Sequence, residues 1–176
     1  MGTRDELAVA RRLSAAVLAV SGRLDVPDVL QTIVDTAREL VGAQYAALGV
    51  PDGGGSFAQF LVAGISPQQQ AAIGPLPRQH GLLGVMLRES VPQRVPDIRA
   101  DSRFGWWPAA HPVLQAFLGV PIRAGEDVLG AIYVANKAGG FTDADEEMLT
   151  VLAAHAAIAL THARLSARSR ELTNAG

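Results

Sequence analysis

The sequence predicts an α+β domain built on a central antiparallel β-sheet, with helices packed on one face of the sheet. Residues 114–122 and 128–135 are apolar on both faces and are joined by the polar turn 123–127, which is typical of two covered central strands. Residues 44–50 and 57–63 form a second pair of strands around a glycine-rich turn. Amphipathic helical patterns precede the strand at residues 44–50 and follow the strand at residues 128–135.

Composition limits what the chain can do. Its 176 residues suit a single domain, and a net charge of −2 without a basic stripe makes nucleic acid an unexpected partner. The absence of cysteine removes disulfides, thiolate ligation and thiol catalysis. No apolar run looks long enough to span a bilayer and no signal-peptide pattern opens the chain, so we expect a cytoplasmic protein without a membrane partner.

The first third of the chain is predicted to form two helices, followed by the strands at residues 44–50 and 57–63. We expect residues 1–22 to form an N-terminal helix and residues 23–176 to form the main domain. Asp25 caps the second helix, Pro27 lies in its first turn and Gly42 ends it. The apolar residues of this helix recur every three or four positions and form one buried stripe: Leu30, Ile33, Val34, Ala37, Leu40 and Val41.

The middle of the chain has a weaker pattern. Short helices are expected at 67–73 and 82–89, with His80 between them as an exposed loop residue. Residues 91–96 suit an edge strand, because their prolines cannot donate to a central ladder.

The last helix is expected to begin at Thr142, with Asp145 at the capping-box position, and to run to about Leu172. Its length of roughly 45 Å exceeds what covering a small sheet requires. One stripe can meet the sheet: Leu149, Leu152, Ala156, Ala159 and Ala163. A second stripe has the three–four spacing of a heptad seam: Met148, Val151, His155, Ile158, His162, Leu165, Ser169 and Leu172. The second stripe predicts a homodimer through the terminal helices.

Small residues gather on one face of the two central strands. Strict alternation places Leu129, Ala131, Tyr133 and Ala135 on one face of the second strand, and Phe117, Gly119 and Pro121 on one face of its partner. Alanine and glycine around one tyrosine leave room beside the sheet. The sequence therefore predicts a ligand pocket on the face opposite the helices.

His111 precedes this pair of strands. Pro112 follows it and disfavours a helical conformation for the histidine, which places it on an extended connector. From the residues alone, a loop histidine that bonds a nearby carbonyl is the simpler interpretation, since one histidine does not make a metal site.

Longer stretches resemble a known family. The run HPVLQAFLGVPIRAGEDVLGAIYVANK, continued by AGGFTDADEE, resembles the second half of a GAF domain, and LDVPDVLQTIVDTARELVGAQYAALGV resembles the first. The resemblance covers about Leu24 to Leu165. More narrowly, the chain resembles the haem-binding GAF domains of actinobacterial sensor histidine kinases of the DevS/DosT type. It departs from them where it reads His-Pro-Val, because that group usually has His-Pro-Pro-Met.

The narrower resemblance implies a haem b site that senses oxygen, nitric oxide, carbon monoxide or redox state. It implies that His111 is the proximal iron ligand, that Tyr133 lines the distal side, and that Ala131 and Leu118 belong to the cofactor pocket. The signal would pass through the C-terminal helix to a histidine kinase or another output domain.

Two features leave alternatives open. Asn136-Lys137, Phe141 and Asp145-Glu146 resemble the NK-F-DE motif of cyclic-nucleotide-binding GAF domains, although a structural Lys–Asp contact between strand and helix explains them more simply. The chain also suits a haem-free GAF module that acts in dimerisation and signal relay or binds another small ligand. An enzyme is not expected, because no nucleophile–base pair appears and the GAF methionine sulfoxide reductases, by resemblance, rely on cysteines.

Overall fold

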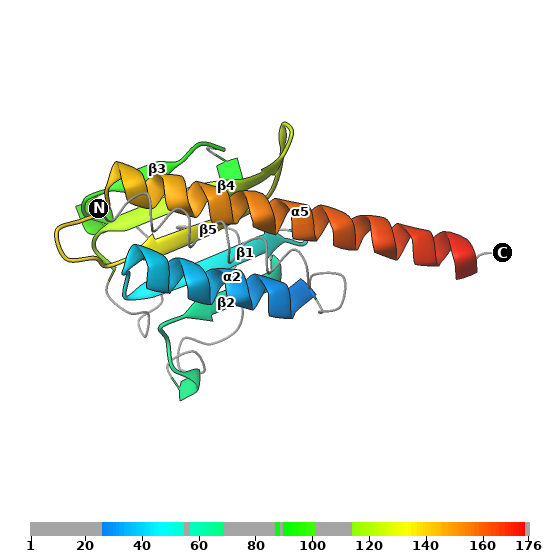
Figure 1. The fold of residues 1–176 in the computed structure, drawn as a ribbon, viewed down its shortest axis with the longest axis horizontal. Coiled ribbons are helices and arrows are strands. Elements are labelled where there is room, and N and C mark those ends of the chain that lie inside the picture. Colours follow the sequence, from blue (N-terminus) through cyan, green and yellow to red (C-terminus); the bar gives the residue numbers. More distant parts are fainter. Residues whose placement is uncertain (1–25, 55–56, 69–86, 89, 101–113, 175–176) are drawn as a thin grey trace.

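The structure of the protein is a computed structural model, and it describes residues 26–54, 57–68, 87–88, 90–100 and 114–174 (Figure 1). The elements in chain order are α2 (Val26–Val41), β1 (Tyr45–Pro51), β2 (Phe57–Ala63), β3 (Gln93–Val95), the 3₁₀ turn η1 (Ile98–Ala100), β4 (Phe117–Ala124), β5 (Asp127–Ala135) and α5 (Asp143–Asn174). The N-terminal helix predicted for 1–22 lies outside the described residues, as do the greater parts of the two short helices predicted in the middle of the chain.

The strands form one five-stranded sheet in the order β2-β1-β5-β4-β3, and every neighbouring pair is antiparallel. β5 and β4 lie inside the sheet, and β3 lies at its edge, as their apolar and proline patterns predict. The sheet and its helices confirm the predicted α+β fold.

A β-bulge interrupts the alternation of β5. Ile122 of β4 pairs with Gly130, and Arg123 pairs with Val128, so Leu129 is an extra residue without a partner across the ladder. Its side chain turns to the other face of the sheet and joins the core beneath the helices. The prediction that Leu129 shares a face with Ala131 is therefore wrong.

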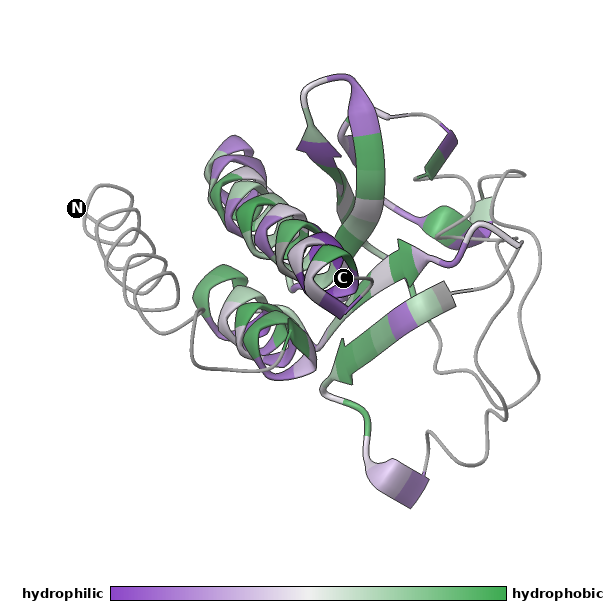
Figure 2. Cartoon of the chain, turned by 90° about the vertical axis from the view of Figure 1, so that its right-hand side faces the viewer, coloured by the Kyte–Doolittle hydropathy of each residue, from purple (hydrophilic) through white to green (hydrophobic). Residues whose placement is uncertain are grey.

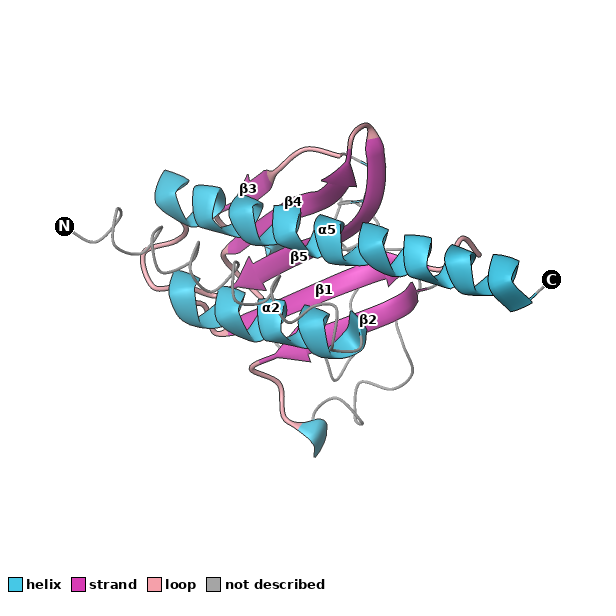
Figure 3. Ribbon diagram, turned by 45° about the vertical axis from the view of Figure 1, so that its right-hand side comes forward, coloured by secondary structure: helices cyan, strands magenta, loops and turns pink. Residues whose placement is uncertain are grey.

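α2 and α5 pack side by side on one face of the sheet (Figure 3). Their apolar sides, seen in Figure 2, face the strands and build the main core, whose α2 members are Val29, Leu30, Ile33, Val34, Ala37 and Val41. This is the stripe that the sequence predicts, with Leu40 only partly buried at its margin. Gly42 ends α2 with a positive φ of 77°, and its N–H donates to the carbonyl of Arg38 (3.1 Å).

α5 begins with the predicted capping box. The N–H of Asp145 donates to Thr142 Oγ1 (3.2 Å), and the N–H of Thr142 donates to Asp145 Oδ2 (2.9 Å). The helix packs on the sheet as far as Leu160, and its remaining turns project past the strands (Figure 1). Met148 is 2% exposed and belongs to the core, so the predicted seam does not begin there.

α5 is also long and apolar enough, by composition alone, to cross a membrane. The expectation that no run reaches this length is therefore wrong. The apolar residues of its first half are buried against the sheet, which gives them a place in a folded domain without a bilayer.

Candidate functional site

The face of the sheet opposite α2 and α5 carries small side chains around one tyrosine. On this face Tyr133 lies between Ala47 of β1 and Gly119 of β4, its partners in the two ladders. Two residues back along β5, Ala131 pairs with Gly49. These five residues are named here the small-residue face, and all of them are buried. Neighbouring apolar residues pack around them: Tyr45, Phe60, Val62, Leu87, Val95, Ile98, Leu114, Phe117 and Ala135.

Tyr133 is held by packing. Its ring centroid lies 5.4 Å from that of Phe117, with the ring planes tilted by 38°. The side chain is 6% exposed, and burial raises the pKa of its phenol well above the ordinary value of 10, so the hydroxyl remains protonated. The hydroxyl can therefore donate to a ligand placed against this face.

The predicted cofactor residues do not all lie together. Tyr133 and Ala131 are neighbours on the small-residue face, as predicted. Leu118 points to the other face, where it is fully buried beneath the helices, because adjacent residues of a strand alternate between faces. Leu118 therefore does not line this face, and that prediction is wrong. His111 and His80 lie outside the described residues.

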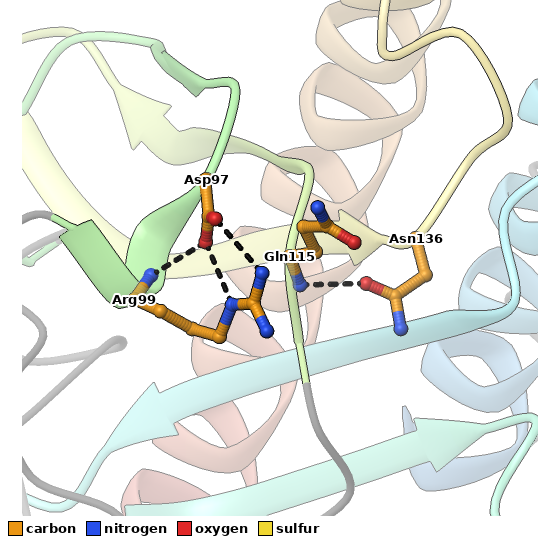
Figure 4. Close-up of polar contacts among 4 residues, drawn as sticks. All are labelled: Asp97, Arg99, Gln115 and Asn136. Atoms are coloured by element: carbon orange, nitrogen blue, oxygen red, sulfur yellow. Dashed lines mark hydrogen bonds and ion pairs between the residues drawn. The ribbon is translucent and has the colours of Figure 1, made fainter.

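Both ends of the segment that contains His111 are fixed to the sheet. Before this segment, the N–H of Ile98 donates to the carbonyl of Gln115 (2.9 Å). After it, the N–H of Gln115 donates to Asn136 Oδ1 (2.7 Å; Figure 4). Asp97 supports the first end, since its carboxylate accepts from Arg99 N, Nε and Nη2 at 3.0, 3.0 and 2.9 Å.

Asn136 is a residue whose role the sequence analysis missed. It follows β5 with a positive φ of 64°, a conformation that asparagine tolerates better than most residues. Its Nδ2 donates to Gln44 Oε1 (3.1 Å), so one side chain bonds to segments on either side of β5. The only signal in the sequence was its place at the start of the NK-F-DE pattern.

Lys137 makes the contact that the simpler interpretation of this pattern predicts. Its Nζ lies 2.9 and 2.8 Å from the two carboxylate oxygens of Asp145, which is 6% exposed. One carboxylate thus receives an ammonium and also caps α5. The structural interpretation of the pattern is confirmed.

Side-chain clusters typical of metal binding do not occur in the described part of the chain, where no three His, Asp or Glu residues come together. The described candidate site is therefore the small-residue face, and its chemistry is apolar contact plus one donor.

The fold recurs in many solved domains. A GAF domain from a phosphoenolpyruvate-protein phosphotransferase of Coxiella burnetii is 20% identical, with coverage of 96% of this chain and 99% of that one and a TM-score of 0.81. Free methionine-R-sulfoxide reductase from Neisseria meningitidis, solved with its substrate, is 15% identical over 91% and 93% of the two chains (TM-score 0.65). At these identities the likeness concerns the fold.

One neighbour is a GAF domain of a DevS protein. The GAF-B domain of DevS from Mycobacterium smegmatis is 25% identical, over 82% of this chain and 99% of that one, with a TM-score of 0.60. A sequence model of the GAF domain family matches residues 23–161, most of the chain. With the antiparallel sheet and its helical layer, this match confirms the resemblance: the chain belongs to the GAF domain family.

Proposed function

We propose that this GAF domain is a sensory module that binds haem b through His111 and relays the state of the haem through α5. The observation that carries the proposal is the small-residue face, where the buried side chain of Tyr133 stands between alanine and glycine. Haem, when bound, supplies an iron that takes oxygen, nitric oxide or carbon monoxide, or changes redox state.

The described residues fit one side of such a group. A macrocycle is flat and largely apolar, and Ala47, Gly119 and Ala131 add little relief to the sheet beside Tyr133. The Tyr133 hydroxyl, kept protonated by burial, serves as the donor toward a diatomic ligand, directly or through a water. His111 serves as the single protein ligand of the iron, as the family resemblance implies.

Relay is assigned to α5. Its first half packs on β4 and β5, so a displacement of either strand would displace the helix. Its second half leaves the domain and is available to a histidine kinase or other output domain and to a second copy of the chain (Figure 1). In this proposal the domain itself performs no catalysis.

His111→Ala tests the haem assignment. The variant and the wild type are expressed with haem supply, and their ultraviolet-visible spectra are compared, with His80→Ala as the matched control. We expect a Soret band in the wild type and in His80→Ala and none in His111→Ala. A Soret band unchanged in His111→Ala and lost in His80→Ala would move the ligand to His80.

A second candidate function is a haem-free module for dimerisation and signal relay, or for binding another small ligand. The observation that favours it is the exposed apolar row on α5: Ile158, Leu165 and Leu172 are 50%, 62% and 75% exposed. Soluble monomers seldom leave such a row uncovered. A wild type that forms dimers but shows no Soret band after reconstitution supports this candidate over the first.

A further inference from the structure

Asn136 lies where three segments of the chain meet. Its backbone N–H donates to the carbonyl of Ala116, and its carbonyl accepts from the N–H of Gln44, both at 2.9 Å. Its side chain bonds to Gln115 N at 2.7 Å and to Gln44 Oε1 at 3.1 Å. The amide orientation is fixed by the partners, because only the oxygen can accept from the N–H of Gln115. One residue thus joins the end of β5, the entrance to β1 and the entrance to β4.

On one side, Asn136 contacts Gln115, which lies at the entrance to β4 (Figure 4). Gln115 bonds to Asn136 through its N–H and to Ile98 through its carbonyl, so Gln115 links Asn136 to the residue that begins η1. A displacement of Ile98 changes the position of the Gln115 peptide units.

On the other side, Asn136 reaches α5 through the next residue in the chain. Lys137 holds the carboxylate of Asp145, and that carboxylate caps the helix through the N–H of Thr142. The carbonyl of Lys137 also accepts from the N–H of Gly140 (2.9 Å), which closes the turn between β5 and α5. Asn136 is therefore the direct neighbour in sequence of Lys137, which forms the ion pair with Asp145.

We infer that Asn136 is a positioning residue that couples the contact between Ile98 and Gln115, at the entrance to β4, to the first turn of α5, through Gln115 on one side and Lys137 on the other. The inference rests on the proposed function for what the signal is, because His111 lies between Ile98 and Gln115 in the sequence. The coupling itself is a property of the haem-free chain as well. Its working part is the bond between Asn136 Oδ1 and Gln115 N, since the bond to Gln44 leads to neither Gln115 nor the helix.

Amide hydrogen exchange of the full chain tests the coupling without haem. Asn136→Gly keeps the positive φ and removes the side-chain bonds to Gln115 and Gln44, whereas Asn136→Asp keeps the acceptor for Gln115. Gln44→Ala is the matched control, because it removes the bond from Asn136 Nδ2 to Gln44 and leaves the bond to Gln115 in place. We expect Asn136→Gly to speed exchange several-fold at Gln115 and also at Asp145 and Glu146, while Asn136→Asp and Gln44→Ala stay near the wild type.

Faster exchange confined to Gln115 and Ile98 in Asn136→Gly, with Asp145 and Glu146 unchanged, overturns the inference. If Asn136→Gly does not fold, the denaturant dependence of exchange in the wild type decides. Amides of Gln115, Asp145 and Glu146 should then open as one cooperative unit, and separate openings overturn the coupling.

Haem loading provides the second arm. In the wild type we expect loading to alter exchange at Asp145 and Glu146, and in Asn136→Gly we expect a normal Soret band without that alteration. A wild type without a Soret band contradicts the proposed function, yet the haem-free arm still decides the coupling. Equal alterations in both proteins overturn the role of Asn136.

Discussion

Tyr133 is a buried residue with a polar end on a face of alanine and glycine. Its neighbours across the ladder, Ala47 and Gly119, have no polar side chain. Burial keeps the Tyr133 hydroxyl protonated, so it can donate a hydrogen bond to a ligand bound at this face.

Tyr133→Phe is expected to retain haem and to change how a bound diatomic ligand behaves. Loss of one donor worth on the order of 1 kcal/mol should change oxygen dissociation and autoxidation rates several-fold. The thermal midpoint should change little, because phenylalanine keeps the ring contact with Phe117. Identical rates in both proteins, measured by stopped flow, would show that the hydroxyl does not face the ligand.

Asp145→Ala is expected to destabilise the domain by about 1–3 kcal/mol. The change removes the carboxylate half of the capping box of α5 and leaves the ammonium of Lys137 without its carboxylate. Thr142→Ala is the control, since it removes only the hydroxyl half of the capping box and should cost about 1 kcal/mol. Urea midpoints measure both, and equal losses would contradict a special contribution from Lys137.

At the scale of elements, the sequence predicts most of the described structure, and the reasons for its errors are local. The β2 strand and the end of α2 are found where predicted, because a hairpin and a helix-ending glycine have strong local signals. Strict alternation fails at Leu129, since a bulge depends on the register of two strands and not on one. The prediction that Leu118 lines the cofactor pocket is wrong for the opposite reason. Alternation holds along β4, and it places Leu118 on the face that packs beneath the helices.

The candidate site is predictable only in part. Tyr133 and Ala131 follow from composition and period, and the Lys137–Asp145 pair follows from a known pattern. The bonds from Asn136 to Gln115 and Gln44 join residues that are 21 and 92 positions apart. Amide side chains have no preferred partner in a sequence, so only the fold reveals these bonds.

Gly130→Ala is expected to destabilise the pairing of β5 with β1. An added Cβ would meet the carbonyl oxygen of Gly49 in the neighbouring strand, and backbone atoms there cannot move aside easily. We expect a loss of about 1–3 kcal/mol in urea unfolding. Gly139→Asn is the control, because the space around Gly139 is open and asparagine tolerates its positive φ of 81°. Equal stability of the two variants would contradict a close approach of Gly130 to the backbone of β1.

At the scale of the whole molecule, α5 packs on the domain along its first half and projects into solvent along its second half. Its 32 residues extend past the sheet, and beyond Leu160 the described side chains are exposed or only partly buried. A projecting helical end of this length is marginal in water by itself. The row Val151, Ile158, Leu165 and Leu172 repeats every seven residues, as one position of a heptad does. We therefore propose that a second copy covers this row.

The two histidines of the seam give the dimer a direction of pH dependence. His155 Nδ1 is buried without a hydrogen-bond partner, and burial lowers the pKa of this imidazole. No carboxylate among the described residues pairs with either His155 or His162. In a dimer, a neutral His155 is able to accept a hydrogen bond from His155 of the second copy, whereas two protonated imidazoles repel each other.

The dimer should therefore be strongest above the unperturbed histidine pKa of about 6.5 and weaken as the pH falls below it. Covering His155 with a second copy should lower the pKa of its imidazole further by desolvation, so the separated chains bind more protons and acid favours separation. Sedimentation at about pH 8 and about pH 5.5 measures this in the wild type and in a His155→Leu/His162→Leu double variant. Leu165→Glu should abolish the dimer at both values, and Thr161→Glu, outside the seam on the same exposed part of α5, should not. A monomeric wild type at the higher pH, or equal pH sensitivity in the double variant, would contradict a seam held by neutral histidines.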